Sequence, residues 1–146
     1  MSTGRLWAGT PRRSVEAECA RHGTGALVDG CLAILRDEPP DPALLQVLGG
    51  PGATKFLDGA PHPDTYWWRV WALRGLLWAW DDRATSAVCA ATGDEAWRVR
   101  EMAAKVVARH RVDGALEAVA DLRDDPVPRV RQAAHRAVVR LTGAAL

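Results

Sequence analysis

The chain has 146 residues, 48% hydrophobic and 25% charged, with a formal net charge of +1. This length and composition exclude a disordered chain and predict one globular domain. The small net charge argues against a protein that coats polyanions by bulk charge, and no run of about 18 apolar residues could span a membrane. Residues 1–11 lack a secretory signal pattern, so we expect a cytoplasmic protein.

The first part of the chain predicts irregular helical structure after a tail over residues 1–11. Residues 12–38 carry the apolar and turn residues of one helix pair. The segment that follows is rich in Pro and Gly, with short helical candidates at Pro42–Leu48 and Ala53–Leu57. We therefore interpret residues 12–62 as irregular, shortened repeats.

From residue 63 onward, a pattern repeats every 31 residues, with arginine at Arg69, Arg100 and Arg131. In each copy apolar residues recur at offsets of 0, 3, 4, 7, 8 and 11, apart from His110 in the middle copy. These offsets form one face of an α-helix, and a shorter helix follows after a turn. A fixed period of this size is typical of a solenoid, in which each unit buries its apolar face against its neighbours. The sequence predicts a single helical-repeat domain over 12–146, with regular repeats over 63–142.

The last and clearest copy, residues 124–138, reads Asp-Asp-Pro-Val-Pro-Arg-Val-Arg-Gln-Ala-Ala-His-Arg-Ala-Val, and residues 94–107 and 63–76 carry weaker copies. This pattern resembles the HEAT repeat, particularly the HEAT-like type of the phycobilin lyases. The resemblance implies an all-α fold, a right-handed α-α superhelix of about four and a half helix pairs. It also implies a binding scaffold, although such repeats serve many functions.

In HEAT-like repeats, an arginine at the position of Arg100 and Arg131 usually pairs with an acidic residue at the joint between repeats. The resemblance therefore implies that Arg131 contacts Asp125 or Asp94, and that Arg100 contacts Asp94 or Asp64. The alternative is that these arginines contact an anionic ligand.

Tryptophan is unusually frequent, with seven residues against one Phe and one Tyr. Trp67, Trp78 and Trp80 occupy positions that are cationic or polar in the later copies. An indole buries about 200 Å² when covered, so three exposed ones would form a patch large for a monomer. We expect either the Pro- and Gly-rich segment or a partner to cover them. These three residues are candidate partner-binding residues, and a second copy of the chain is one of the candidate partners.

The later copies also place cations at offsets of 7 and 11 residues, which lie on one helix face. Stacked copies would gather them into a band on the outer surface, where an anion would bind. The alternative is a solvated face. The candidate anion-binding residues are Arg98, Lys105, Arg109, Arg129, Arg136 and Arg140.

Catalytic signals are weak, since the four histidines are scattered and no HExxH, GxSxG or P-loop motif occurs. We expect a non-catalytic scaffold with no cofactor and no metal, whose function is protein–protein interaction. The alternative is nucleic-acid binding through the cationic band. A third hypothesis is a DNA-glycosylase-like activity, because Trp80, Asp81 and Asp82 faintly resemble the aromatic and aspartate pocket of HEAT-like glycosylases.

Overall fold

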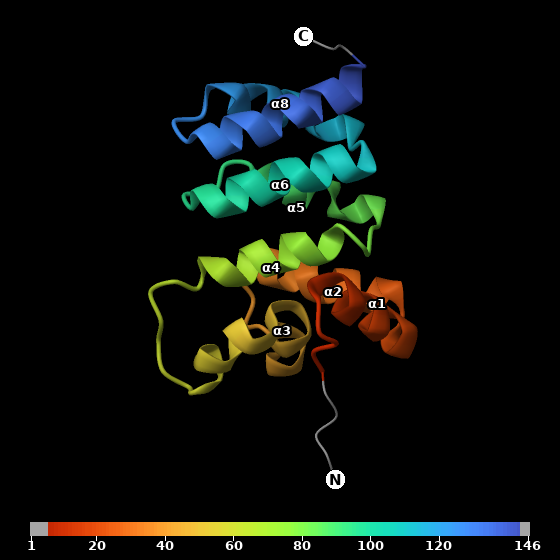
Figure 1. Ribbon diagram of the computed structural model, residues 1–146, viewed down its shortest axis with the longest axis vertical. Helices are drawn as coiled ribbons and strands as arrows, with labels where there is room; N and C mark the ends of the chain where they lie inside the picture. The colour runs from red at the N-terminus through yellow and green to blue at the C-terminus, as the bar shows by residue number, and fades with distance from the viewer. Residues whose placement is uncertain (1–5, 144–146) are drawn as a thin grey trace. The chain divides into compact units, whose positions relative to one another are not determined.

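The computed structural model describes residues 6–143, and all regular structure within them is helical (Figure 1). The expectation of an all-α repeat fold is confirmed. The elements, in chain order, are α1 (Pro11–His22), α2 (Thr24–Leu35), α3 (Pro42–Gly49), η1 (Gly50–Leu57), α4 (Tyr66–Leu76), η2 (Asp82–Ala84), α5 (Thr85–Ala91), α6 (Trp97–His110), η3 (Asp113–Ala115), α7 (Leu116–Asp121), η4 (Leu122–Asp124) and α8 (Pro128–Thr142), where η marks a 3-10 helix.

The chain divides into two compact units, Met1–Asp81 and Asp82–Leu146. The first contains α1 to α4 and the second contains α5 to α8. The single domain over 12–146 stays a prediction, and part of it, 144–146, lies outside the described residues, as do residues 1–5 of the expected tail.

In the first unit, α1 and α2 form the helix pair predicted over residues 12–38. The hydroxyl of Thr10 accepts a hydrogen bond from the amide of Arg13 at 3.2 Å and caps α1. The helix ends at Gly23, whose φ of +93° is a conformation that other residues rarely adopt. The buried hydroxyl of Ser14 donates to the carbonyl of Val47 at 2.6 Å, which ties α1 to α3.

The Pro- and Gly-rich segment forms α3 and η1, which correspond to the two short helices predicted there. Phe56 of η1 makes edge-on contacts with Trp68 and Trp71 of α4, at ring-centroid distances of 5.5 and 5.8 Å. Gly49 and Gly52 approach the indole of Trp71 from the same segment. The segment therefore packs against part of the Trp-rich helix α4.

In the second unit, the predicted apolar stripe is buried along both long helices. On α6, Val99, Ala103 and Val107 are completely buried, and on α8 Val130 and Ala134 are completely buried. The two helices pack against each other. Alanine at the contact removes the bulk that would separate the backbones. The remaining face of α8 is largely exposed, whereas α6 has most of its surface at least partly covered.

The close approach of Gly49 to Trp71 gives a stability prediction. A Cβ on Gly49 would lie 2.6 Å from the Trp71 ring, and that indole is buried and too rigid to yield. We expect Gly49→Ala to lower the free energy of unfolding by about 1–3 kcal/mol in urea denaturation. Gly52→Ala is the matched control, because its Cβ would meet the same ring at 3.4 Å, and its effect should stay below about 0.5 kcal/mol. Equal effects would show that the indole moves freely.

Candidate binding surfaces

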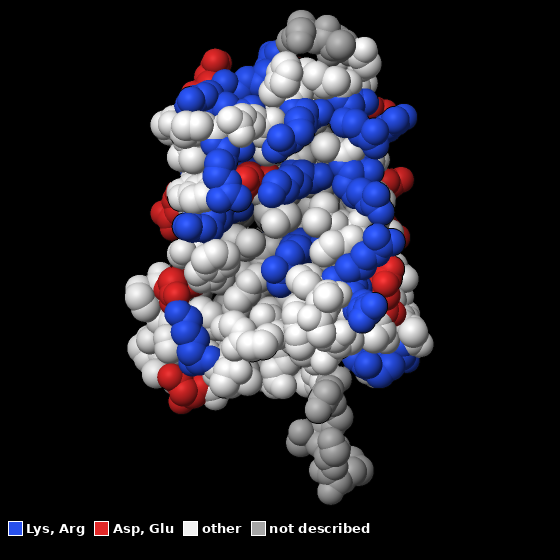
Figure 2. Space-filling model, in the orientation of Figure 1, with Lys and Arg blue, Asp and Glu red and all other residues white. Residues whose placement is uncertain are grey.

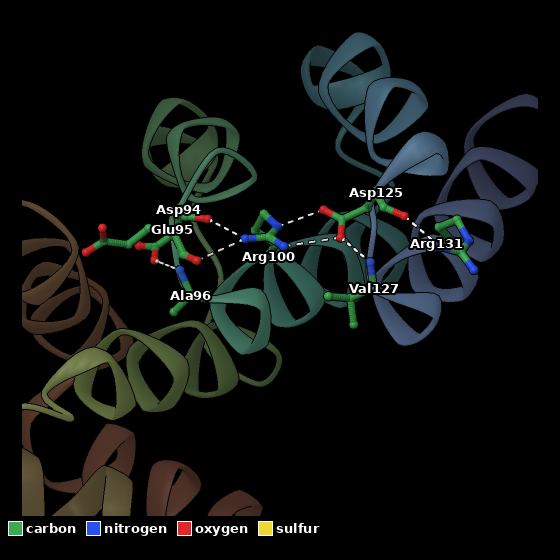
Figure 3. Close-up of polar contacts among 7 residues, drawn as sticks. All are labelled: Asp94, Glu95, Ala96, Arg100, Asp125, Val127 and Arg131. Carbon is green, nitrogen blue, oxygen red and sulfur yellow. Dashed lines mark hydrogen bonds and ion pairs between the residues drawn. The ribbon is translucent and has the colours of Figure 1, made fainter.

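The joint between the repeats of the second unit is built on an arginine fork (Figure 3). Arg100 of α6 donates from Nε and Nη2 to the two carboxylate oxygens of Asp125, at 2.7 and 3.2 Å. Its Nη1 donates to the carbonyls of Asp94 at 2.8 Å and Glu95 at 3.2 Å. The side chains of Arg100 and Asp125 are only 15% and 5% exposed, so this is a bidentate pair largely withdrawn from water.

The structure modifies the expected ladder of arginines and acids. Arg100 and Arg131 do reach Asp94 and Asp125, but through the backbone carbonyl six residues earlier, at 2.8 Å in both cases. The carboxylate partner of Arg100 is Asp125, which lies 25 residues later at the next joint. Asp64 accepts a hydrogen bond from Lys55. The expected contacts of Arg100 with Asp94 and of Arg131 with Asp125 are thus present through backbone carbonyls, whereas the carboxylate that pairs with Arg100 comes from the following joint and was not among the expected acids.

Asp94 and Asp125 share a second role at the start of the following helix. The Oδ1 atoms accept hydrogen bonds from the amides of Ala96 and Val127, at 2.8 and 2.9 Å. The carboxylate of Asp125 therefore orders the chain before α8 and binds α6 at the same time. Burial raises the pKa of Asp125, but the hydrogen bonds from Arg100 and from the Val127 amide outweigh burial, and the net pKa is below its ordinary value.

The predicted cations gather on one face of the second unit, where Figure 2 shows Lys and Arg in rows over α6 and α8. At one end of this face, Arg98 and Arg129 stack on the ring of Trp97, at 4.4 and 5.3 Å from its centroid. The buried Glu101 pairs with Arg129 at 3.0 Å and with Lys105 at 3.7 Å. Arg98 and Arg129 therefore hold structural contacts at this end.

The other four predicted cations surround a groove of about 600 Å³ between α6 and α8. Its lining residues are Lys105, Ala108, Arg109, Ala133, His135, Arg136, Val139 and Arg140. Lys105, Ala108 and Arg109 of α6 are the repeat equivalents of Arg136, Val139 and Arg140 of α8. The repeat thus lines both sides of the groove with the same kinds of side chain. We define this surface, with its cationic rim and apolar floor, as the α6–α8 groove.

The candidate tryptophans lie in the first unit and line no part of this groove. Trp67, Trp78 and Trp80 are each half-buried, so none of the three indoles is fully exposed to solvent. The ring of Trp67 lies 5.2 Å from that of Tyr66. The Pro- and Gly-rich segment contacts other indoles of the helix, and partner binding by these three stays a prediction.

Sequence analysis missed the apolar floor of the groove and the role of Glu101. Ala108 and Val139 share a repeat position, so the period was a usable signal for the floor. Glu101 offered no such signal, because Gln132 occupies its repeat position and makes no equivalent pair in the described residues. Burial of Glu101 depends on Arg129 of the next repeat, and this becomes visible only in three dimensions.

A family model for HEAT repeats matches residues 50–138, which is more than half of the chain. No curated protein and no solved structure matches the chain significantly. Among residues 6–143, no group of three or more His, Cys, Asp or Glu side chains is placed to hold a metal ion. None of the described helices combines the length and the apolar composition that a membrane crossing requires.

The arginine fork gives a prediction on stability and its pH dependence. Asp125→Ala would leave the largely buried Arg100 guanidinium without its carboxylate, so we expect a loss of about 3 kcal/mol in urea denaturation at pH 7. Asp124→Ala, an exposed neighbour in the same joint, is the control and should change stability by less than about 0.5 kcal/mol.

The loss should also depend on pH with a defined sign. Since folding lowers the pKa of Asp125, its contribution is complete above the unfolded pKa of about 4 and disappears as pH decreases through the folded pKa. The gap between the wild type and Asp125→Ala should therefore narrow as the pH decreases below about 4. A gap that stays constant over this range would contradict the charged fork.

Proposed function

Because the chain belongs to the HEAT-repeat family, whose members generally mediate protein interactions, we propose that it is a non-catalytic scaffold that binds an acidic segment of a protein partner. The observation that carries the proposal is the α6–α8 groove, in which cations surround an apolar floor. A protein segment with both acidic and apolar side chains matches both parts of this surface.

The floor of the groove favours apolar side chains. Ala108 and Val139 are partly exposed and offer methyl groups with no polar atom beyond the backbone, and the volume of about 600 Å³ accommodates a few side chains of a partner. Binding pockets of this size are commonly apolar with a small number of polar groups that fix orientation. A partner would gain affinity by burying apolar side chains here.

The rim of the groove favours acidic residues. Helices α6 and α8 together carry eight Lys and Arg residues and one acidic residue, Glu101, whereas α7 carries Glu117 and Asp121 and no cation. Arg136 makes no ion pair with the described residues, and Arg140 reaches only the carbonyl of Ala108, at 3.4 Å. The rim therefore has positive charge available for carboxylates.

Nucleic-acid binding remains the second candidate because the rows of cations in Figure 2 would also attract phosphates. Two features favour protein. The second unit has eleven Lys and Arg residues against nine Asp and Glu residues, so its long-range attraction for a polyanion is weak. Trp97, the aromatic residue of this face, already stacks with Arg98 and Arg129 and is not open for a base.

Three further expectations from the sequence are less specific, and we keep them as proposals. The Asp-Asp-Pro joint at residues 124–126 resembles the phycobilin-lyase type of HEAT repeat, and we take from this likeness only the class of binding scaffold. Partner binding or self-association through the Trp-rich helix α4 would add a second contact in the first unit. We also keep a cytoplasmic location as a proposal.

A binding experiment with two labelled probes tests the proposed function. The first is a peptide of alternating glutamate and leucine pairs, and the second is a single-stranded DNA of about 20 nucleotides. We expect the peptide to bind the chain more tightly than the DNA at physiological salt. The variant Arg109→Glu/Arg140→Glu should weaken peptide binding by about tenfold or more, because it reverses charge on both sides of the groove.

The matched control is Arg13→Glu/Arg36→Glu, which reverses two exposed arginines of the first unit, and peptide affinity should change by less than about twofold. A peptide of glutamate alone should bind more weakly than the glutamate and leucine peptide, since it cannot use the apolar floor. Tighter binding of the DNA, with an affinity that decreases steeply between about 50 and 200 mM salt, would instead support nucleic-acid recognition.

A further inference from the structure

Arg131 is the repeat equivalent of Arg100, but the two residues differ in what they bind. Both donate from Nη1 to the carbonyl of the aspartate six residues earlier, at 2.8 Å. Arg100 also forms an ion pair with the carboxylate of Asp125, whereas Arg131 is exposed and forms no ion pair with the described residues. Figure 3 shows Arg100 between two joints and Arg131 beside one. The Asp125 carboxylate lies near enough for Arg131 to help lower its pKa, but within residues 6–143 no carboxylate is within ion-pair distance of the Arg131 guanidinium.

The surface around Arg131 is suited to an anion. A hollow of about 470 Å³ is lined by Arg123, Pro128, Arg131, Gln132, His135 and Arg136, with no acidic residue in the lining. The carbonyl of Asp125 holds one arm of the Arg131 guanidinium, which reduces the rotamer freedom that binding would remove. The planar fork of an arginine matches a carboxylate with two parallel hydrogen bonds, which a lysine cannot provide.

We propose that Arg131 is a carboxylate clamp that binds an aspartate of a protein partner, presented at the start of a helix in the way Asp125 is presented to Arg100. The class of partner is taken from the proposed function, and the proposal assigns that partner a second contact in a hollow that adjoins the α6–α8 groove and shares His135 and Arg136 with it. The bound carboxylate of Asp125 is the template: one oxygen accepts from the amide of Val127, and both accept from the Arg100 fork. A helix start with the same turn would meet Arg131 with the same geometry.

The probe for this site is a synthetic peptide with the chain's own joint, residues 121–134, in which the three arginines are replaced by alanine. Its matched partner carries Asn in place of Asp125. Titration into the intact chain is followed by the NMR signal of each arginine Nε–H group. We expect the aspartate peptide to shift the Arg131 signal saturably, with a dissociation constant of about 1 mM, and the asparagine peptide to bind at least about tenfold more weakly.

Two substitutions separate the clamp from general charge attraction. Arg131→Lys keeps the charge but removes the fork, so it should lower peptide affinity by about tenfold. Arg123→Gln, in the same lining, should change it by less than about twofold, because its Nε is already engaged by the carbonyl of Ala120 at 3.1 Å. Circular dichroism of both variants checks that the fold is kept. Equal binding by Arg131→Lys and the wild type would overturn the clamp.

The remaining outcomes of these experiments either identify a different ligand for Arg131 or show whether this site and the α6–α8 groove bind independently. Inorganic phosphate that shifts Arg131 at lower concentration than the aspartate peptide would overturn the carboxylate assignment. Self-association that Arg131→Lys abolishes, without peptide binding, would assign the surface to a second copy of the chain and overturn the proposal. Arg109→Glu/Arg140→Glu should leave the joint peptide bound, since neither residue lines this hollow. Failure of the groove and failure of the clamp are therefore distinguishable.

Discussion

The pairing of Arg100 with Asp125 is the constraint on which the second unit depends. Two charged groups are removed from water, and this costs more than their attraction returns unless hydrogen bonds satisfy their remaining atoms. Here the fork, the Val127 amide and two backbone carbonyls do so. One carboxylate therefore sets both the start of α8 and its position against α6. The pair specifies register, whereas the buried apolar stripe supplies most of the stability.

The charge distribution of the unit follows from this arrangement. Because one face of α6 and α8 is given to alanine and valine in the core, the six predicted cations lie on another face, while Arg100 and Arg131 lie at the joints. Glu101 is the one acidic residue of these two helices, and it is buried because Arg129 and Lys105 compensate its charge. Neutralisation at one end of the face leaves the positive charge concentrated at the other, where the groove opens. The location of the candidate site is thus a consequence of how the two helices are held together.

Much of the fold could be predicted because the 31-residue period records which positions are buried in every copy. The buried stripe through Ala103 and Ala134 and the short helices at α3 and η1 follow from local pattern. The carboxylate partner of Arg100 could not be predicted, since a contact over 25 residues depends on how successive helices stack. The α6–α8 groove could be predicted in part: its cations share an offset, and the period also relates Ala108 to Val139, but that these residues enclose a groove depends on how the two helices pack.

Residues at equivalent positions of the repeat do not all make the same contacts. Arg100 and Arg131 share a residue type, a helix position and a 2.8 Å bond to a backbone carbonyl. They differ in the acidic neighbour on the far side. Asp125 pairs with the guanidinium of Arg100, which is nearly buried, whereas Arg131 has no such neighbour among the described residues and is exposed. In a fold built from equivalent units, a binding group is therefore recognised by comparison with its satisfied copy. The internal copy at Arg100 is the reason why we propose a carboxylate as the ligand of Arg131.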